Sequence, residues 1–151
     1  MNEKIFGFGE GAEIAFSIPG EPSRVTHQSG TRIGKNGRVY KKKPLIEWEQ
    51  HLMEAMKAKA PETPMDGPIL LDVTFGFKAR RKKDCCTYKT TRPDTDNMIK
   101  TVKDILTRAG FWADDAQVVV EHGSKLWVDE PGIVIKIEQL GGRCEDWRIQ
   151  E

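Results

Sequence analysis

Two aspartates two residues apart, with a lysine four residues after the second, are the part of this sequence best suited to chemistry. Asp94 and Asp96 flank a single threonine, Lys100 follows, and a second acidic pair, Asp114 and Asp115, precedes an apolar run. Oxygen-only ligands of this kind suit Mg²⁺ or Mn²⁺, which retain waters and bind substrate phosphate oxygens. A bound ion of this type polarises a phosphodiester and generates hydroxide near neutral pH. The spacing therefore predicts a metal-dependent nuclease.

The same residues also have a purely structural interpretation. Asp94 or Asp96 can cap a helix that begins after Pro93. Asp96 and Lys100 are four residues apart on such a helix, and a surface pair of this kind contributes only about 0.2–0.5 kcal/mol. The acidic pair at 114–115 can form a turn before a strand. From the spacing alone, both interpretations stay open.

The segment resembles the RusA family of Holliday junction resolvases, which are small homodimeric endonucleases. The family pattern is Asp-x-Asp-Asn at the start of a helix, a Lys four residues after the second Asp, and then Gly-Phe-Trp-x-Asp-Asp-x-Gln-Val. The chain matches it with Asp94-Thr95-Asp96-Asn97, with Lys100, and with the run from Gly110 to Val118. The resemblance extends over roughly residues 12–140, and its specific part is the block 92–120.

The resemblance implies a set of site residues and a cofactor. Carried over by position, the metal-binding carboxylates are Asp94, Asp96 and Asp115, the catalytic lysine is Lys100, and the ion is Mg²⁺ or Mn²⁺. Asp114 is then a turn or outer residue. Asn97 and Gln117 either support the metal ligands or hydrogen-bond the backbone, and the sequence does not choose between these roles. The resemblance also implies a homodimer, whose two-fold symmetry matches that of a four-way junction.

The distribution of charge favours a nucleic-acid partner although the net charge is only +1. Thirteen of the 24 Lys and Arg residues fall in the segments 31–43 and 78–92, where Asp84 is the sole acidic residue. Clusters of this kind bind phosphate backbones, although they also occur in solvated loops. The predicted DNA-binding residues are Arg32, Lys35, Arg38, Lys41, Lys42, Lys43, Arg80, Arg81, Lys82, Lys83 and Arg92.

Hydrophobic periodicity predicts a β-α-β-α-β-β order in one α+β domain. The expected strands are 13–18, 69–77, 117–127 and 133–139, the last two forming a hairpin, and the expected helices are 44–59 and 95–109. These elements favour a four-stranded mixed sheet with two helices on one face. A short hairpin is expected near Asn36-Gly37, and the basic loop 78–93 is a candidate for disorder without DNA.

Two features of this arrangement bear on the candidate site. The helix 95–109 is expected to place Asp96 and Lys100 on one exposed face. The short connection after that helix is expected to fold the next strand back and return Asp115 towards Asp94 and Asp96.

Length and composition narrow the class of protein. A chain of 151 residues is expected to be one domain, with a core at about 12–140 between a flexible N-terminus and a flexible C-terminal tail. No apolar run reaches the roughly 20 residues needed to span a membrane. The three cysteines show neither a disulfide framework nor zinc spacing. These features together favour a reduced, cytoplasmic protein with no membrane partner.

The sequence therefore favours a Mg²⁺-dependent endodeoxyribonuclease that resolves Holliday junctions in recombination and repair. Two alternatives remain: a basic module that binds nucleic acid without cutting it, and a nuclease for other branched DNA such as flaps or forks. The carboxylates cannot discriminate between branched substrates, because the basic loops and the dimer geometry select shape.

Overall fold

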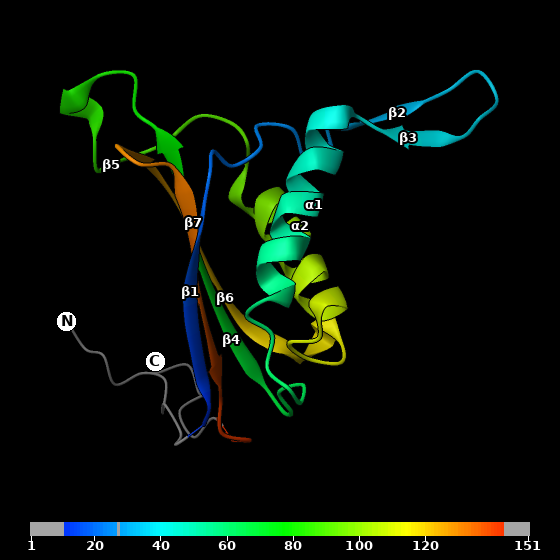
Figure 1. The fold of residues 1–151 in the computed structure, drawn as a ribbon, viewed down its shortest axis with the longest axis vertical. Coiled ribbons are helices and arrows are strands. Elements are labelled where there is room, and N and C mark those ends of the chain that lie inside the picture. Colours follow the sequence, from blue (N-terminus) through cyan, green and yellow to red (C-terminus); the bar gives the residue numbers. More distant parts are fainter. Residues whose placement is uncertain (1–10, 27, 144–151) are drawn as a thin grey trace, which may run out of the picture.

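A five-stranded mixed sheet forms one layer of the molecule. The computed structural model describes residues 11–26 and 28–143, and Figure 1 shows the arrangement. The strands lie in the order β1 (Glu13–Pro19), β7 (Gly132–Gln139), β4 (Ile69–Lys78), β6 (Val118–Val128) and β5 (Thr87–Tyr88). The central strand, β4, pairs antiparallel with β7 and parallel with β6. Side chains on both faces of β4 are mostly buried, which explains its almost continuous apolar sequence.

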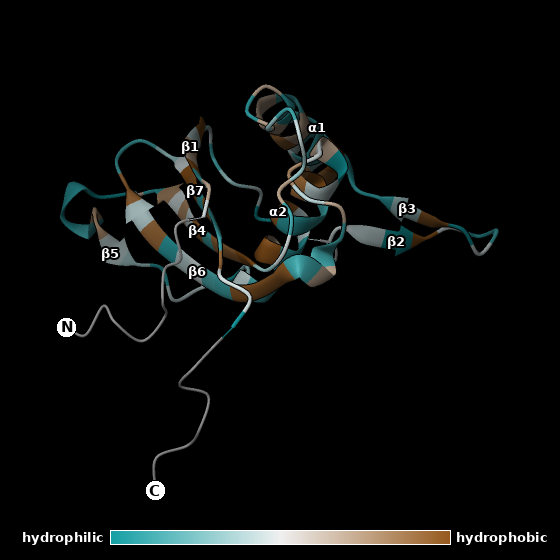
Figure 2. Cartoon of the chain, turned by 90° about the horizontal axis from the view of Figure 1, so that it is seen from below, coloured by the Kyte–Doolittle hydropathy of each residue, from teal (hydrophilic) through white to brown (hydrophobic). Residues whose placement is uncertain are grey.

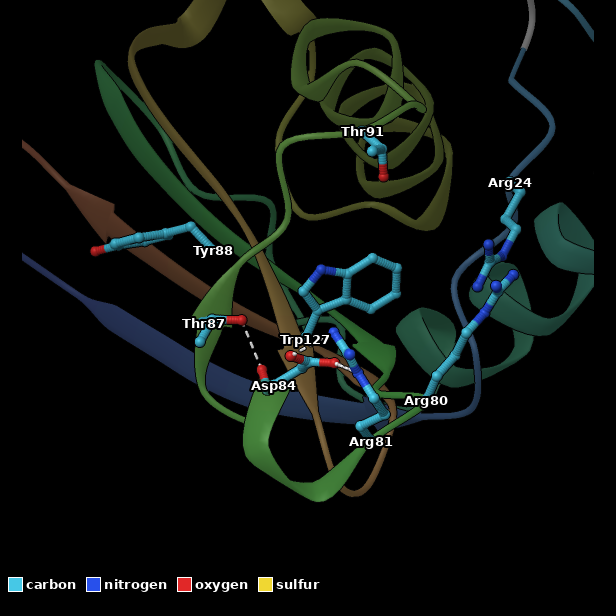
Figure 3. A pocket seen from close by; sticks show the side chains of 8 residues that line it. All are labelled: Arg24, Arg80, Arg81, Asp84, Thr87, Tyr88, Thr91 and Trp127. Carbon is cyan, nitrogen blue, oxygen red and sulfur yellow. Dashed lines mark hydrogen bonds and ion pairs between the residues drawn. The ribbon is translucent and has the colours of Figure 1, made fainter.

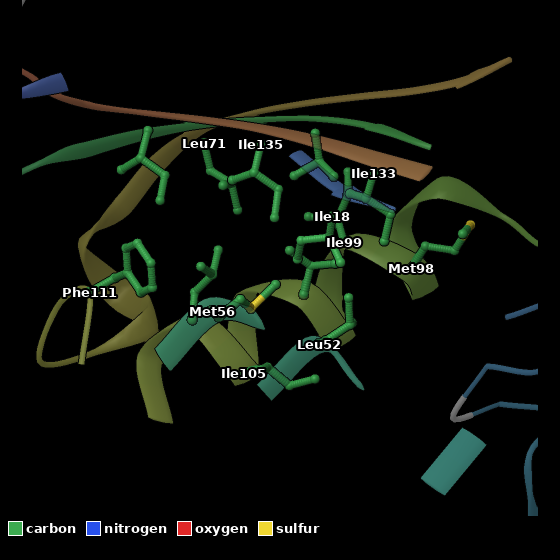
Figure 4. Packing of buried hydrophobic residues seen from close by; sticks show 14 of the residues in the cluster. Ile18, Leu52, Met56, Leu71, Met98, Ile99, Ile105, Phe111, Ile133 and Ile135 are labelled. Carbon is green, nitrogen blue, oxygen red and sulfur yellow. The ribbon is translucent and has the colours of Figure 1, made fainter. Parts of the chain in front are cut away.

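Two helices, α1 (Lys43–Lys57) and α2 (Thr95–Ala109), pack on one face of this sheet (Figure 1). Each helix presents an apolar stripe to the core, represented by Leu52 and Met56 on α1 and by Ile105 on α2. Figure 4 shows these side chains meeting Leu71 and Ile135 of the sheet. Burying a side chain of this size contributes about 1.5–3 kcal/mol relative to leaving it exposed, so this one interface holds α2 against the sheet.

A small two-stranded sheet projects from the body of the molecule. β2 (Thr31–Ile33) and β3 (Val39–Lys41) pair antiparallel, and Figures 1 and 2 show this arm extending away from the helices. Its tip carries the predicted turn at Asn36-Gly37, where Gly37 has a φ of 74°. The predicted hairpin is confirmed.

The predicted α+β class and the two helices on one face are confirmed, but two details of the sheet were wrong. The sheet has five strands rather than four, because the basic loop 78–93 contains a short strand, β5, that pairs with β6. That loop also contains a 3₁₀ turn, η1 (Lys82–Asp84). The loop was expected to be disordered without DNA, but η1 and β5 are ordered parts of it.

The second error concerns the last two strands, which do not form a hairpin. β6 and β7 both pair with β4, which lies between them. Pairing with β4 satisfies the backbone groups of both strands and covers a central strand that would otherwise have an open edge.

The predicted flexibility of residues 1–10 and of the tail from residue 144 lies outside the described residues. None of the helices within the described ranges is long and apolar enough to cross a bilayer.

Candidate active site at the start of helix α2

The predicted helix that carries the candidate site is confirmed at both ends. α2 begins at Thr95, directly after Asp94, and ends before Gly110, whose φ of 95° closes the helix in the left-handed conformation. The stripe that includes Met98 and Val102 is buried against the core. Asp96 and Lys100 lie four residues apart and are both exposed. The prediction that they share one exposed face is therefore supported by their exposure and by helical geometry.

Close packing places the start of α2 directly on β6. Gly123 of β6 lies against Ile99, and a Cβ atom at Gly123 would overlap that side chain. The absence of a side chain at this position lets the first turns of the helix approach the strand backbone. The carboxylates of α2 are therefore carried by an element that the sheet supports.

Two lysines fix the chain immediately before Asp94. The Lys125 Nζ atom of β6 donates to the carbonyl oxygens of Thr91, at 2.8 Å, and Pro93, at 2.7 Å. The Lys89 Nζ atom donates to the carbonyl oxygens of Thr91, at 3.1 Å, and Arg92, at 2.6 Å. Two ammonium groups thus hold three successive carbonyl groups, and this anchors the position from which α2 starts.

The environment of Lys89 concentrates positive charge at this end of the molecule. Lys89 is only 3% exposed, and its ammonium group lies 4.7 Å from the ring centroid of Trp127 and 5.1 Å from that of Phe77. Burial, and then the charges of Lys125 and Arg24, lower the pKa of Lys89. The positive charges of Lys89, Lys125 and Arg24 therefore lie close together, and such a concentration of positive charge attracts a phosphate anion.

The side chains of Asp94, Asp96 and Lys100 do not make the contacts that the structural interpretation requires. Asp94 occupies the N-cap position without a side-chain capping bond. Within residues 11–26 and 28–143, no hydrogen bond or ion pair engages the side chains of Asp94, Asp96 and Lys100. Asp104 pairs with Arg108, at 3.5 Å, rather than with Lys100. All three groups are therefore available to a ligand.

Asp115 lies at the other end of α2, so the expectation that it returns towards Asp94 and Asp96 in the same chain was wrong. It begins a short 3₁₀ turn, η2 (Asp115–Gln117), and accepts a hydrogen bond from the Thr107 hydroxyl. Eleven residues separate Asp96 from Thr107, which corresponds to about 16 Å along the helix. Carboxylates that share one ion lie within about 5 Å of each other, given metal–oxygen distances near 2.0–2.6 Å.

The neighbours of Asp115 have structural roles. The Asp114 carboxylate caps η2 by accepting from the backbone N–H of Ala116, at 2.8 Å. The Gln117 side chain completes this capping box and also donates to the carbonyl oxygens of Met65 and Gly67, at 3.1 and 3.0 Å. Of the two roles open for Gln117, the structure therefore shows the backbone one.

Asn97 makes a different contact, because its amide donates to the Gln28 Oε1 atom at 3.0 Å. This bond connects the start of α2 to the segment that precedes β2.

No three His, Cys, Asp or Glu side chains in the described part of the chain lie close enough together to hold an ion. Asp94 and Asp96 nevertheless fit Mg²⁺ as a pair, since this ion commonly takes one or two carboxylates together with waters and substrate phosphates. The chain by itself thus brings together two of the three predicted metal ligands, with Lys100 one turn away.

The predicted DNA-binding residues occupy two separate places. One group, Arg32, Lys35, Arg38, Lys41, Lys42 and Lys43, lies on the β2–β3 arm and at the start of α1. The other group, Arg80, Arg81, Lys82, Lys83 and Arg92, lies in the segments around η1 and before α2.

Three further residues near the site were missed by sequence reasoning. Lys125 and Trp127 lie in β6, and Arg24 lies outside both basic segments. No local signal marks these three, because only the tertiary structure brings β6 and residue 24 to the segment before α2.

Comparison with known proteins identifies the family of the chain. The model of the family described as endodeoxyribonuclease RusA matches residues 19–138, a range that holds both helices, the sheet strands β4 to β6 and nearly all of β7, but only the last residue of β1. The chain belongs to the RusA family. A crossover junction endodeoxyribonuclease of Lactococcus phage r1t is 34% identical over 73 residues, which cover 48% of this chain and 56% of that protein. The Escherichia coli K12 enzyme of the same name is 36% identical over 73 residues, covering 48% of this chain and 61% of the enzyme.

A longer match covers nearly the whole of another relative. The protein YqaN of Bacillus subtilis, described as uncharacterized, is 29% identical over 140 residues, which cover 84% of this chain and 96% of that protein. The matches to the two named resolvases span little more than half of their length. The fold and the start of α2 therefore lie within the RusA family, whereas the reaction and substrate of this chain are matters of proposal.

Proposed function

We propose that this RusA-family chain is a Mg²⁺-dependent endodeoxyribonuclease that cuts four-way DNA junctions symmetrically in recombination and repair. The observation that carries the proposal is the pair of exposed carboxylates at the start of α2, with Lys100 one turn away, none of which the described part of the fold engages. Membership of an endodeoxyribonuclease family supplies the reaction class. The relatives named as crossover junction endodeoxyribonucleases supply the substrate.

Asp94 and Asp96 would hold Mg²⁺ or Mn²⁺ in this proposal. When bound, the ion would supply an activated water and neutralise charge on the phosphodiester. The chain positions the two carboxylates, because Lys89 and Lys125 hold the carbonyl groups of residues 91–93 by hydrogen bonds. Lys100 would either help deprotonate the attacking water or stabilise the negative charge that develops on the scissile phosphate.

We assign Asp115 to the site of a second copy of the chain. Asp115 contacts Thr107, about 16 Å along α2 from Asp96, which is too far for the two carboxylates of one chain to share an ion. In a two-fold dimer, an arrangement that brings Asp115 of one copy to Asp96 of the other also creates the reciprocal contact. Such a dimer has two equivalent sites, which suits a substrate that must be cut on two opposing strands.

The two basic groups would bind the arms of the junction. Phosphate contacts by Lys and Arg supply most sequence-independent affinity for DNA. The β2–β3 arm projects from the body of the molecule (Figure 2), so its cations can reach DNA well beyond the site on α2.

The substrate is tested by cleavage of labelled DNA in Mg²⁺ with four-way junctions, three-way junctions, flaps and linear duplexes. We expect paired nicks at symmetric positions in the four-way junction and little cleavage of linear duplex. Preferential cutting of flaps or forks would show that the proposed substrate is wrong and that the proposed cleavage reaction is right. Tight binding of every branched DNA without cleavage would identify a binding module and refute the proposal.

A further inference from the structure

A cavity of about 410 Å³ lies between β5, β6 and the segment that leads into α2. Figure 3 shows the side chains around it. The residues that matter here are Arg24, Arg80, Arg81, Tyr88, Thr91 and Trp127. Its volume falls in the range of small-molecule sites, which is about 300–1,000 Å³, and the lining combines cationic and aromatic groups.

The charge of the lining favours an anion. Three guanidinium groups and one carboxylate, that of Asp84, line the cavity. Arg81 donates two hydrogen bonds to Asp84, at 2.8 and 3.2 Å, and Arg24 pairs with Glu21 at 3.4 Å. Arg80 makes no hydrogen bond or ion pair with any residue in the described ranges. The lining therefore carries more positive charge than it neutralises, and guanidinium groups bind phosphate oxygens in pairs.

The aromatic groups add a surface for a flat ring. Trp127 is half-buried, and it packs edge-to-face against Phe77 with ring centroids 6.4 Å apart. The Lys89 ammonium group also lies over the indole, which contributes to the lining of the cavity. Tyr88 stands at the rim with 77% of its surface exposed. Aromatic rings of this kind stack with unpaired bases, and they do so with little dependence on sequence.

The position of the cavity connects it with the candidate active site. Thr91 lines the cavity, and its carbonyl oxygen is held by Lys125 and Lys89, the lysines that anchor the chain before Asp94. Thr91 is three positions before Asp94, which limits the distance between their Cα atoms to about 11 Å. This is short enough for one DNA strand to occupy both places.

We propose that this cavity binds one unpaired nucleotide of the DNA strand that enters the site at Asp94 and Asp96. The base would stack on Trp127, and the adjoining phosphate would contact Arg80 and Arg24. Both faces of a base inside a duplex are already stacked, so the cavity selects DNA whose pairing is open, as at a branch point. The inference rests on the proposed function and adds how that function recognises its substrate.

The test uses 2-aminopurine, a fluorescent base that stacking quenches, within a short oligothymidylate in metal-free buffer. We expect binding of this oligonucleotide to quench the fluorescence. Trp127→Leu should remove the quenching and weaken binding by roughly thirtyfold, the middle of the range for one base–aromatic contact. Trp127→Phe should retain part of both effects, since it keeps a ring.

An exposed residue provides a second variant if Trp127→Leu does not fold. Arg80→Gln removes a cavity cation that has no partner in the described structure, and it should weaken binding of the oligonucleotide several-fold. Arg108→Gln is the matched control, because Arg108 is an exposed arginine at the far end of α2. Its affinity should equal that of the unmodified protein.

Several results would overturn the assignment. The first is quenching that persists in both Trp127→Leu and Arg80→Gln. The second is a loss of affinity in Arg108→Gln equal to that in Arg80→Gln. The third is the absence of quenching in the unmodified protein. Binding of free 2-aminopurine mononucleotide as tightly as the oligonucleotide would assign the cavity to a nucleotide rather than to a DNA strand.

The outcome is separable from that of the proposed function. A protein that cuts junctions but does not quench 2-aminopurine refutes the cavity assignment alone. A protein that quenches it but cuts no branched DNA refutes the proposed function alone.

Discussion

Mixing two inactive variants should restore cleavage if Asp115 acts in the site of a second copy. The perturbations are Asp96→Asn in one chain and Asp115→Asn in the other. In the mixed dimer, one site combines both substitutions, and the other combines the intact Asp96 of one copy with the intact Asp115 of its partner. If Asp96 and Asp115 acted within one chain, each site of the mixed dimer would carry one substitution and no activity would return. The roughly 16 Å between Asp96 and Thr107, the partner of Asp115, argues against such a site.

The size of the rescue follows from the symmetry of the dimer. Random pairing of equal amounts gives about half mixed dimers, each with one intact site of two, so roughly a quarter of the wild-type number of sites should be active. A mixed dimer purified through two different tags should therefore nick one strand of a four-way junction without resolving it. Each variant alone should be inactive.

The control is a mixture of Asp94→Asn with Asp96→Asn, which damages the same half of the site in both chains and should restore nothing. No nicking by the purified Asp96→Asn and Asp115→Asn mixed dimer would refute the shared site. Full activity of the Asp115→Asn protein by itself would remove Asp115 from the chemistry.

The remaining predictions concern individual contacts. Asp114→Ala should retain cleavage but lower the free energy of unfolding by about 1 kcal/mol, measured by denaturant titration, because it removes the cap of η2. Lys125→Gln should lower kcat more than junction affinity in metal-free buffer, since it loosens the chain before Asp94; equal losses of both would contradict a positioning role. Burial lowers the pKa of Lys89, so the unfolded chain holds that proton more tightly than the folded chain. The free energy of unfolding of the wild type, relative to that of Lys89→Met, should therefore rise with pH between neutral pH and about 10.4. Replacing Arg80, Arg81, Lys82 and Lys83 with Ala should flatten the dependence of log affinity on log salt by about 0.9 for each lost phosphate contact; an unchanged slope would place the DNA surface elsewhere.

Local signals in the sequence were sufficient to predict the element that carries the site. The apolar stripe from Met98 to Leu106 and the glycine at 110 define α2 within the sequence itself. The helical position of Asp96 relative to Lys100 then follows from the 3.6-residue repeat. These features need no knowledge of the rest of the chain.

Contacts between distant segments could not be predicted in the same way. The turn between β6 and β7 looks like a hairpin connection, but β4, some fifty residues earlier, pairs with both strands. Local patterns record the length and apolar character of a strand but not which strand lies beside it.

The position of Asp115 was mispredicted for a related reason. A chain that leaves the C-terminal end of a helix is still at that end a few residues later. A strand rises about 3.3 Å per residue, so several residues of β6 are needed to return to the level of Asp96. The residue of β6 that reaches the start of α2 is Gly123, eight positions after Asp115.

The most direct test of the central claim compares the unmodified protein with Asp96→Asn on a labelled four-way junction, with and without Mg²⁺. Asp96 is exposed, and the described fold makes no use of its carboxylate, so the Asn variant should fold normally and bind the junction in metal-free buffer at least as tightly. We predict symmetric nicks by the unmodified protein only when Mg²⁺ is present, and a loss of more than about a hundredfold in cleavage by the variant. Cleavage by Asp96→Asn at the wild-type rate, or junction binding by the unmodified protein without Mg²⁺-dependent cutting, would contradict the account.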